Sequence, residues 1–175
     1  MRRSILAALV AVSLAACAHA PERPPLRTVE KVDLGRYTGT WYEIATIPMS
    51  FQKGCVAVSA TYALRADGEV DVLNRCRKET LDGPERSARG RAWSVDPSNA
   101  KLEVRFFWPF KGDYWIVELG SDYEYAVVGH PDRKYLWILS RTPSMGEALY
   151  QAILGRLREQ GYDVSLLVRT LQPAS

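Results

Sequence analysis

Cysteine and histidine have the most specific chemistry of the side chains in this sequence, and there are few of them. The chain of 175 residues has three cysteines and two histidines: Cys17, Cys55, Cys76, His19 and His130. His130 stands in a turn-like stretch with proline, and His19 lies in a Pro-rich segment near the N-terminus. The sequence has no Cys/His cluster with metal-site spacing, no nucleophile elbow and no Gly-rich phosphate loop. These residues therefore predict no metal ion, no cofactor and no catalytic base.

Cys17 ends a segment with the features of a bacterial lipoprotein signal. Two arginines precede a short apolar stretch, residues 5–16, whereas a bilayer span needs roughly 20 apolar residues. The stretch is typical of a secretory signal, and its end, Leu-Ala-Ala-Cys at 14–17, looks like a lipobox. At such a site the cysteine thiol receives a diacylglycerol and becomes the new N-terminus. We expect residues 1–16 to be removed and Cys17 to be acylated, with an ordinary signal and an incidental cysteine as the alternative.

The acyl groups at Cys17 would attach the protein to a membrane. Each buried methylene contributes about 0.8 kcal/mol, and stable anchoring takes more than one chain, so a diacylglycerol-cysteine with chains such as palmitate suffices. Ala18, and not Asp, follows the cysteine. The sorting rule for these lipoproteins then implies the outer membrane, where we expect the periplasmic face. Residues 17–32 are rich in proline and charge and are predicted to form a lipidated, flexible tether.

The charge of the chain argues against nucleic acid as a partner. The formal net charge is +3, and it falls to +1 when the signal with Arg2 and Arg3 is removed. Binding to nucleic acid needs a concentrated basic face, which this balance does not predict. Removal of 16 of the 175 residues leaves 159, a length that fits one domain.

Cys55 and Cys76 remain once Cys17 is used for lipid. They would face an oxidising periplasm, where disulfides persist. A bridge that closes this short loop would stabilise the fold by about 3 kcal/mol through the entropy of the unfolded chain. Two unlinked, small core residues are the alternative.

The rest of the chain reads mostly as short β-strands separated by turn signals. Alternation is clearest at residues 101–106, where Leu, Val and Phe occupy the even positions and charged residues the odd ones. Such a strand has one buried and one solvated face, as in an antiparallel sheet. Eight strands are expected, at residues 40–47, 55–65, 69–78, 86–95, 101–108, 113–120, 123–130 and 134–141. The short turns between them predict an all-β, eight-stranded antiparallel up-and-down barrel, which removes exposed sheet edges.

The period of the pattern changes after the eighth strand. Ser144 and Glu147 form a predicted capping box at the start of a helix. Apolar residues then share one helical face: Leu149, Ala152, Ile153 and Leu157. Gly161 is expected to end the helix. A C-terminal α-helix of about four turns should therefore pack outside the barrel, followed by a short last strand at residues 164–170.

Three short motifs, in this order, resemble the signatures of the lipocalin family. Gly39-Thr40-Trp41 resembles the G-x-W signature at the start of the first strand, and Ser121-Asp122-Tyr123 resembles T-D-Y with Ser for Thr. Arg141, at the end of the eighth strand, resembles the third signature. The stretches FFWPFKGDYW and PDRKYLWILSRTP resemble the bacterial branch of the family, close to apolipoprotein D. The resemblance covers nearly all of residues 33–172, which we expect to be the lipocalin domain.

The resemblance implies a structural role for the residues of these motifs. In the family the Arg guanidinium packs across the Trp ring, a cation–π contact that closes the floor of the barrel. The topology agrees, because every second turn of an up-and-down barrel lies at the same end. The residues expected to close the floor, without taking part in chemistry, are Gly39, Trp41, Asp122, Tyr123 and Arg141.

The interior of an eight-stranded barrel is just wide enough to be filled by side chains or to hold one small ligand. The resemblance implies a calyx that binds and stores or transports a fatty acid, a lysophospholipid or a similar hydrophobic molecule in the cell envelope, without catalysis. A filled structural barrel is one alternative. A lipid-modifying enzyme is another, and it would need Cys55 or Cys76 as a free cavity thiol. The exact ligand, the choice among storage, transport and detoxification, and the presence of a homodimer stay open.

The same topology selects residues for the interior and for the mouth. The loops at the open end are expected at residues 48–54, 79–85, 108–112 and 130–134, and the inward side chains of Ala88, Gly90 and Ala92 should leave room. The predicted ligand-binding residues are Val58, Tyr62, Val104, Phe106, Trp108, Phe110, Tyr114, Tyr125, Trp137 and Leu139. Cys55 and Cys76 fall near the rim, about three residues from direct opposition, so that their bridge requires a bulge or bend.

Overall fold

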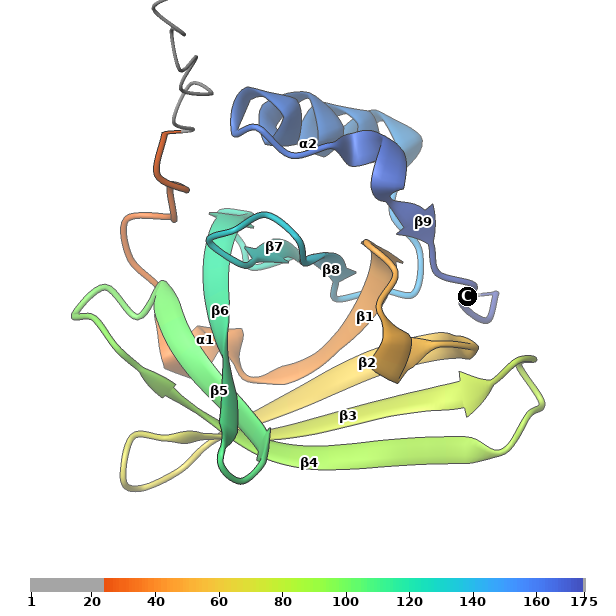
Figure 1. Ribbon diagram of the computed structural model, residues 1–175, viewed down its shortest axis with the longest axis horizontal. Helices are drawn as coiled ribbons and strands as arrows, with labels where there is room; N and C mark the ends of the chain where they lie inside the picture. Colours follow the sequence, from red (N-terminus) through yellow and green to blue (C-terminus); the bar gives the residue numbers. More distant parts are fainter. Residues whose placement is uncertain (1–23, 175) are drawn as a thin grey trace, which may run out of the picture.

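Eight antiparallel strands close into a barrel. The computed structural model describes residues 24–174. The strands are β1 (Gly39–Thr46), β2 (Cys55–Leu64), β3 (Val70–Lys78), β4 (Glu85–Ser94), β5 (Lys101–Phe107), β6 (Phe110–Leu119), β7 (Tyr125–Gly129) and β8 (Leu136–Ser140). Each strand pairs with the one before it, and β8 pairs with β1, so that the sheet closes on itself (Figure 1). The predicted all-β, up-and-down barrel is confirmed.

Side-chain alternation sorts the apolar residues into two cores. On β8, Trp137 and Leu139 point into the barrel, whereas Leu136 and Ile138 point outward. The inner cluster consists of Val32, Tyr37, Trp41, Tyr62, Val70, Val72, Ala92, Ala100, Leu102, Ile116, Ala126, Val128 and Leu139, with Ala60, Val104, Phe106, Tyr114, Tyr123 and Trp137 among the partly buried residues packed against it. The outer cluster consists of Leu26, Ile44, Ala45, Ile47, Val117, Val127, Leu136, Ile138, Tyr150, Ile153, Leu154, Leu157 and Tyr162.

Helix α2 (Glu147–Glu159) covers the outer cluster, and Figure 1 shows it outside the barrel over β7 and β8. The helix buries Tyr150, Ile153, Leu154 and Leu157. The expected apolar face is therefore right for Ile153 and Leu157 but wrong for Ala152, which is exposed. The buried stripe passes through Tyr150 and Leu154 instead, because these larger side chains reach the sheet.

The two ends of α2 differ in how well the sequence predicted them. The capping box is wrong: Gly146 is the N-cap, in an extended conformation, and the helix begins only at Glu147, so that Ser144 lies two residues before the cap. Gly161 ends the helix as predicted. Its φ is +81°, and its N–H donates to the carbonyl of Arg158 at 2.9 Å, a C-terminal cap that favours glycine.

The segment before the barrel packs against it. Leu26 is buried in the outer cluster and Val32 in the inner cluster, and the N–H of Val29 donates to the carbonyl of Ile116 at 3.0 Å. The expectation that a flexible tether extends to residue 32 is therefore wrong from Leu26 onward, because apolar residues at three-residue spacing are buried despite the charged and Pro-rich composition. The expected signal and the acylated Cys17 lie outside the described residues.

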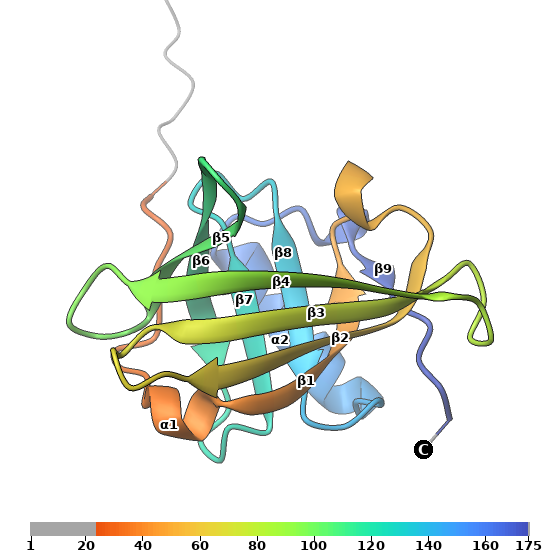
Figure 2. The ribbon, with the colours of Figure 1, turned by 90° about the horizontal axis from the view of Figure 1, so that it is seen from below.

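The two ends of the barrel are closed to different degrees. Helix α1 (Leu34–Tyr37), capped by the Asp33 carboxylate, follows the N-terminal segment and lies at one end. The short helix η1 (Ser50–Gln52) and the β3–β4 loop lie at the other end, as Figure 2 shows. We call the α1 end the floor and the opposite end the mouth.

The C-terminal tail completes the seam between β1 and β2. These strands pair only from Gly39 to Tyr42 on the β1 side. Beyond that point the tail, with η2 (Val164–Leu166) and β9 (Val168–Arg169), takes over as the neighbour of β1. It also reaches β2, since the Ala57 N–H donates to the Leu171 carbonyl at 2.7 Å. The predicted last strand is thus present but shorter than expected.

Candidate ligand site

The floor is closed by the signature tryptophan and arginine. The guanidinium carbon of Arg141 lies 3.8 Å from the ring centroid of Trp41, and Trp41 is 0% exposed. The same guanidinium donates to four backbone carbonyls, those of Arg36, Thr38, Thr40 and Tyr123. Gly39 has a φ of +95°, and a Cβ there would lie 3.2 Å from the Arg141 guanidinium. A side chain at position 39 would therefore be strained and would press on this contact.

Tyr123 belongs to the floor, whereas Asp122 contributes little to it. The Tyr123 hydroxyl accepts a hydrogen bond from the Asp33 N–H at 2.9 Å, and Arg36 lies over its ring at 4.1 Å. Asp122 is exposed, and its backbone N–H donates to the Glu124 carboxylate at 3.1 Å. Arg36 and Glu124, which the sequence reasoning missed, thus fix the turn beside Tyr123.

A ladder of aromatic rings rises from the floor into the interior. The ring centroids of Trp41 and Tyr37 are 4.9 Å apart, those of Tyr37 and Tyr62 are 5.5 Å apart, and those of Tyr62 and Tyr114 are 6.1 Å apart. The Tyr114 hydroxyl is hydrogen-bonded to the hydroxyls of Tyr37, at 2.8 Å, and Tyr62, at 2.9 Å. We call Tyr37, Tyr62 and Tyr114 the tyrosine trio. Tyr37 was missed from the sequence because a four-residue helix has no periodic signal.

The tyrosine trio stays uncharged over the physiological pH range. Burial raises the pKa of Tyr62 to about 12, and it raises the pKa values of Tyr37 and Tyr114 well above the ordinary value. Phenolate is disfavoured because little solvent reaches the three hydroxyls. The trio is therefore a set of neutral hydrogen-bonding groups.

The lower half of the barrel is almost filled by its own side chains. One small cavity of about 10 Å³ remains beside the trio, which is about the space of a single small polar group. Its lining residues are Leu34, Tyr37, Thr38, Tyr62, Val70, Val72, Ala92, Leu102, Val104 and Tyr114. Only the tyrosines and Thr38 bring polar side chains to this apolar space.

The upper half of the barrel is less fully buried than the floor. Val104, Phe106, Tyr114 and Trp137 pack against the inner cluster, yet each is only half-buried. Solvent therefore reaches these inward-facing side chains, whereas Trp41 at the floor is fully buried. The small residues of β4 were expected to leave space inside the barrel, and Phe106 fills part of it. Its ring lies against Gly90, where an added Cβ would approach the ring to 2.8 Å.

Most of the predicted pocket residues lie where the sequence placed them. Tyr62, Val104, Phe106, Tyr114, Trp137 and Leu139 belong to the inner cluster or pack against it. Trp108 and Phe110 are exposed at the mouth. Val58 is half-buried next to a bulge in β2, where its carbonyl accepts from Gln172.

Tyr125 does not line the interior, and its assignment to the ligand site is wrong. On β7 the inward positions are Ala126 and Val128, so Tyr125 points outward and packs against the outer cluster. Its hydroxyl accepts a hydrogen bond from Arg156 of α2 at 3.3 Å. The helix, rather than a ligand, is the partner of this side chain.

Comparison with known proteins gives the family of this barrel. Residues 32–172 match the family described as the lipocalin-like domain. The chain belongs to the lipocalin family. It is 38% identical to the outer membrane lipoprotein Blc of Escherichia coli (strain K12), over 98% of this chain and 97% of that protein. It is 41% identical to temperature-induced lipocalin-1 of Arabidopsis thaliana, over 86% and 85% of the two chains. Apolipoprotein D of Bos taurus is 38% identical over 76% and 70%.

Solved structures share the lipocalin fold. Insecticyanin from the tobacco hornworm Manduca sexta matches with a TM-score of 0.67 and 19% identity, over 90% of this chain and 88% of that chain. Lobster apocrustacyanin A1 matches with a TM-score of 0.64 and 18% identity, over 80% and 79%. Likeness at this identity shows the fold. Lipocalins are generally carriers of small hydrophobic molecules, which agrees with the half-buried apolar side chains inside this barrel.

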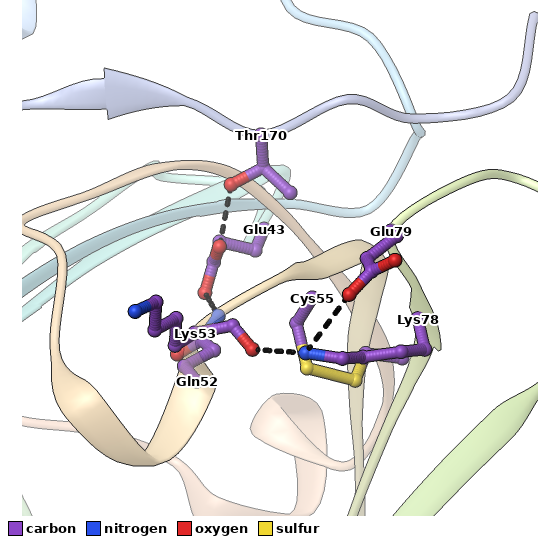
Figure 3. Close-up of a disulfide and its surroundings, with 8 residues drawn as sticks. Glu43, Gln52, Lys53, Cys55, Lys78, Glu79 and Thr170 are labelled. Carbon is purple, nitrogen blue, oxygen red and sulfur yellow. Dashed lines mark hydrogen bonds and ion pairs between the residues drawn. A yellow bond between two sulfur atoms is a disulfide. The ribbon is translucent and has the colours of Figure 1, made fainter. Parts of the chain in front are cut away.

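A disulfide near the mouth ties β2 to β3 in this lipocalin. Cys55 and Cys76 are bonded, with Cα atoms 5.5 Å apart, and the expected bulge is present in β2 between Val56 and Ser59. Figure 3 shows the Lys78 ammonium beside the disulfide, where it donates to the Lys53 carbonyl. Both sulfurs are used in the bond, so the thiol-dependent enzyme alternative lacks its nucleophile in this structure.

Glu43 is a buried carboxylate that the sequence reasoning missed. It is 2% exposed and pairs across β1–β8 with the inward-facing Leu139. Gln52 donates to one carboxylate oxygen at 2.6 Å and Thr170 donates to the other (Figure 3). Burial raises the pKa of this carboxyl, and the hydrogen bonds from Thr170 and Gln52 oppose the rise. Glu43 thus joins η1 and the C-terminal tail to β1.

The described residues hold no arrangement suited to a metal ion. Within residues 24–174, His, Cys, Asp and Glu side chains nowhere gather in a group of three that could bind one. Over the same range, the helices are all too short or too polar to cross a membrane.

Proposed function

We propose that this lipocalin binds one fatty acid, lysophospholipid or similar long apolar molecule in its calyx, and stores or transports it without catalysis. The observation that carries the proposal is the contrast between the two halves of the barrel. The floor is closed by Trp41 and Arg141, whereas the inward-facing Val104, Phe106 and Trp137 above it are only half-buried, and we propose that they line an apolar hollow. Such a hollow suits a linear hydrocarbon chain inserted from the mouth.

The apolar wall supplies enough free energy for useful affinity. An acyl chain of about 14 methylenes gains on the order of 11 kcal/mol when it leaves water, at about 0.8 kcal/mol for each methylene. Association and ordering of the chain oppose a large part of this gain. A dissociation constant in the micromolar range or below follows.

A charged headgroup would stay at the mouth. Arg86 on β4 lies opposite Cys76 on β3 and therefore shares its inward face. Arg86 is exposed, near the rim of the hollow. A carboxylate or phosphate beside this guanidinium would remain partly solvated, which avoids the cost of burying an ion.

The protein is proposed to sit on the outer membrane through acyl groups at Cys17, on the periplasmic face. The described chain starts at the mouth, because the Pro24 carbonyl accepts from Arg133 of the β7–β8 loop at 2.6 Å. Cys17 precedes Pro24 by seven residues, which span at most about 25 Å. The anchor and the mouth would therefore lie on the same side of the barrel.

Exposed aromatic residues at the mouth support loading from the membrane. Phe51, Phe107, Trp108 and Phe110 are 76%, 74%, 82% and 77% exposed, in η1 and at the turn that joins the end of β5 to the start of β6. Aromatic side chains of this kind partition into the interfacial region of a bilayer. A mouth held against the leaflet would take up lipid without passing it through water.

Displacement of a fluorescent fatty acid tests the proposed function. We expect saturable, one-to-one binding to the mature protein, with release of the probe by palmitate or by a lysophospholipid. Native mass spectrometry of protein purified from its own membrane should then show the mass of a bound lipid. Lack of saturable binding would support a filled structural barrel and overturn the proposal.

A further inference from the structure

The tyrosine trio has one more hydrogen-bond donor than it uses. Each of the three hydroxyls has one proton to donate, and two hydrogen bonds join them, Tyr37 to Tyr114 and Tyr62 to Tyr114. One O–H therefore remains for another acceptor. No further hydrogen bond of these hydroxyls occurs within residues 24–174.

The surroundings of this spare donor favour a single uncharged oxygen. The cavity of about 10 Å³ beside the trio has room for one small polar group, and its other walls are mostly apolar. An ionised carboxylate would be costly there, because one O–H cannot replace its hydration. Arg141 does not provide a charge partner for such a carboxylate, since its guanidinium stacks on Trp41 and donates to backbone carbonyls.

The trio is within reach of a ligand in the hollow. Tyr114 is half-buried and packs with Val104 and Trp137 against the inner cluster. Tyr114 and Val104 also line the small cavity beside the trio. A chain that enters from the mouth would thus meet Tyr114 with its far end.

We propose that the tyrosine trio is a polar subsite that binds an uncharged oxygen, a hydroxyl or a carbonyl, at the deep end of the ligand. The inference rests on the proposed function and narrows its substrate class to chains oxygenated at or near the end remote from the headgroup. The headgroup stays at the mouth, and the far oxygen accepts the spare O–H of the trio. A plain hydrocarbon end would leave this donor without a partner.

A paired-ligand measurement tests the subsite. The probes are palmitic acid and 16-hydroxypalmitic acid, together with the matching pairs two carbons shorter and longer, because the depth of the hollow selects the chain length. Without a partner for the hydroxyl, the hydroxy acid should bind less tightly than its parent. In the wild-type protein we expect at least one hydroxy acid to bind as tightly as its parent or more tightly. A variant with all three tyrosines of the trio replaced by phenylalanine has no O–H left to donate, and it should lower the ratio of the two affinities about tenfold.

Tyr125→Phe is the matched control, since it removes a hydroxyl from the outer face and should leave the ratio unchanged. If the triple variant folds poorly by circular dichroism, the wild-type protein decides the question, and weaker binding of all three hydroxy acids than of their parents would overturn the subsite. Equal ratios in the wild type and the triple variant, with both probes bound, would overturn the subsite and leave the carrier proposal intact. Lack of binding of either probe to any variant would overturn both.

Discussion

Replacement of two tryptophans at different depths should affect different properties: Trp41→Ala should mainly lower stability, and Trp137→Ala should mainly weaken ligand binding. Trp41 is fully buried, stacks on Arg141, and donates from its indole N–H to the Tyr37 carbonyl at 2.9 Å. Loss of a buried Trp costs about 3–5 kcal/mol, and the cation–π contact and the hydrogen bond add about 1 kcal/mol each. Because these contributions overlap, we expect Trp41→Ala to lower the free energy of unfolding by about 5 kcal/mol. The melting temperature of a domain this size should then fall by about 10–20 °C.

Trp137 lies at the open end of the same interior. It is half-buried, and its ring stacks on Tyr135 with centroids 6.3 Å apart. Because Trp137 is already partly exposed, Trp137→Ala removes less buried surface than Trp41→Ala, and the free energy of unfolding should fall by only about 1 kcal/mol. If about a quarter of the roughly 200 Å² of a tryptophan contacts the ligand, its loss costs about 1.3 kcal/mol of binding, or about tenfold in Kd.

Thermal unfolding followed by circular dichroism, together with the fluorescent fatty acid titration, measures both effects. Trp41→Phe and Trp137→Phe, which keep a ring, should give intermediate values and serve as controls. The reasoning would be refuted by the opposite order, with Trp137→Ala causing the larger loss of stability and folded Trp41→Ala the larger loss of affinity. That result would mean that floor and ligand site have been exchanged.

Three further predictions concern the disulfide, the buried tyrosines and the mouth. Reduction of the disulfide, which closes a sequence separation of 21 residues, should cost about 3 kcal/mol and about 10 °C in melting temperature, and a variant with both bonded cysteines replaced by alanine should not respond to reductant. Burial raises the pKa of Tyr62 to about 12, above its ordinary 10.0. The stability due to the neutral hydroxyl is therefore present below pH 10 and is lost as the pH rises through about 12. In urea unfolding, the free energy of unfolding of Tyr62→Phe should fall less between pH 10 and pH 12 than that of the wild type, and an identical fall would contradict this. In an unlipidated Cys17→Ser chain, Trp108→Ser should weaken binding to phospholipid vesicles about tenfold. Leu64→Ser, the control, alters an exposed apolar residue near the floor and should leave this binding unchanged. Equal effects of the two substitutions would argue against contact between the mouth and the bilayer.

The barrel could be predicted from the sequence because its strands have one wet face and short turns. Residues 101–106 alternate strictly, and in the structure Leu102 is buried inside while Glu103 and Arg105 point away. The signature residues then placed Trp41 and Arg141 at the same end. Alternation and turn spacing are local properties, so they survive in a single sequence.

Which side chains of β7 face the barrel interior could not be predicted, because both faces of this strand are apolar. Helix α2 covers the outer face, so Val127 outside is as hydrophobic as Ala126 and Val128 inside. A strand buried on both sides has no alternation to interpret, and Tyr125 was assigned to the wrong face. The N-terminal segment was predicted to be a flexible tether because it is rich in charges and prolines, a composition that gives no sign that Val32 is buried.

The outer cluster explains how the barrel can leave part of its interior unfilled. Most small domains rely on one core, and an empty space in it is destabilising. Here α2 adds a second core, in which Ile153 and Leu157 pack against Val127 and Ile138 on the outside of the sheet. Arg156 adds a bond to the Glu118 carboxylate at 2.8 Å. The outer cluster and the floor stabilise the sheet from outside and from below. Tight packing of the upper interior should therefore contribute less to stability, and the small stability cost expected for Trp137→Ala measures this difference.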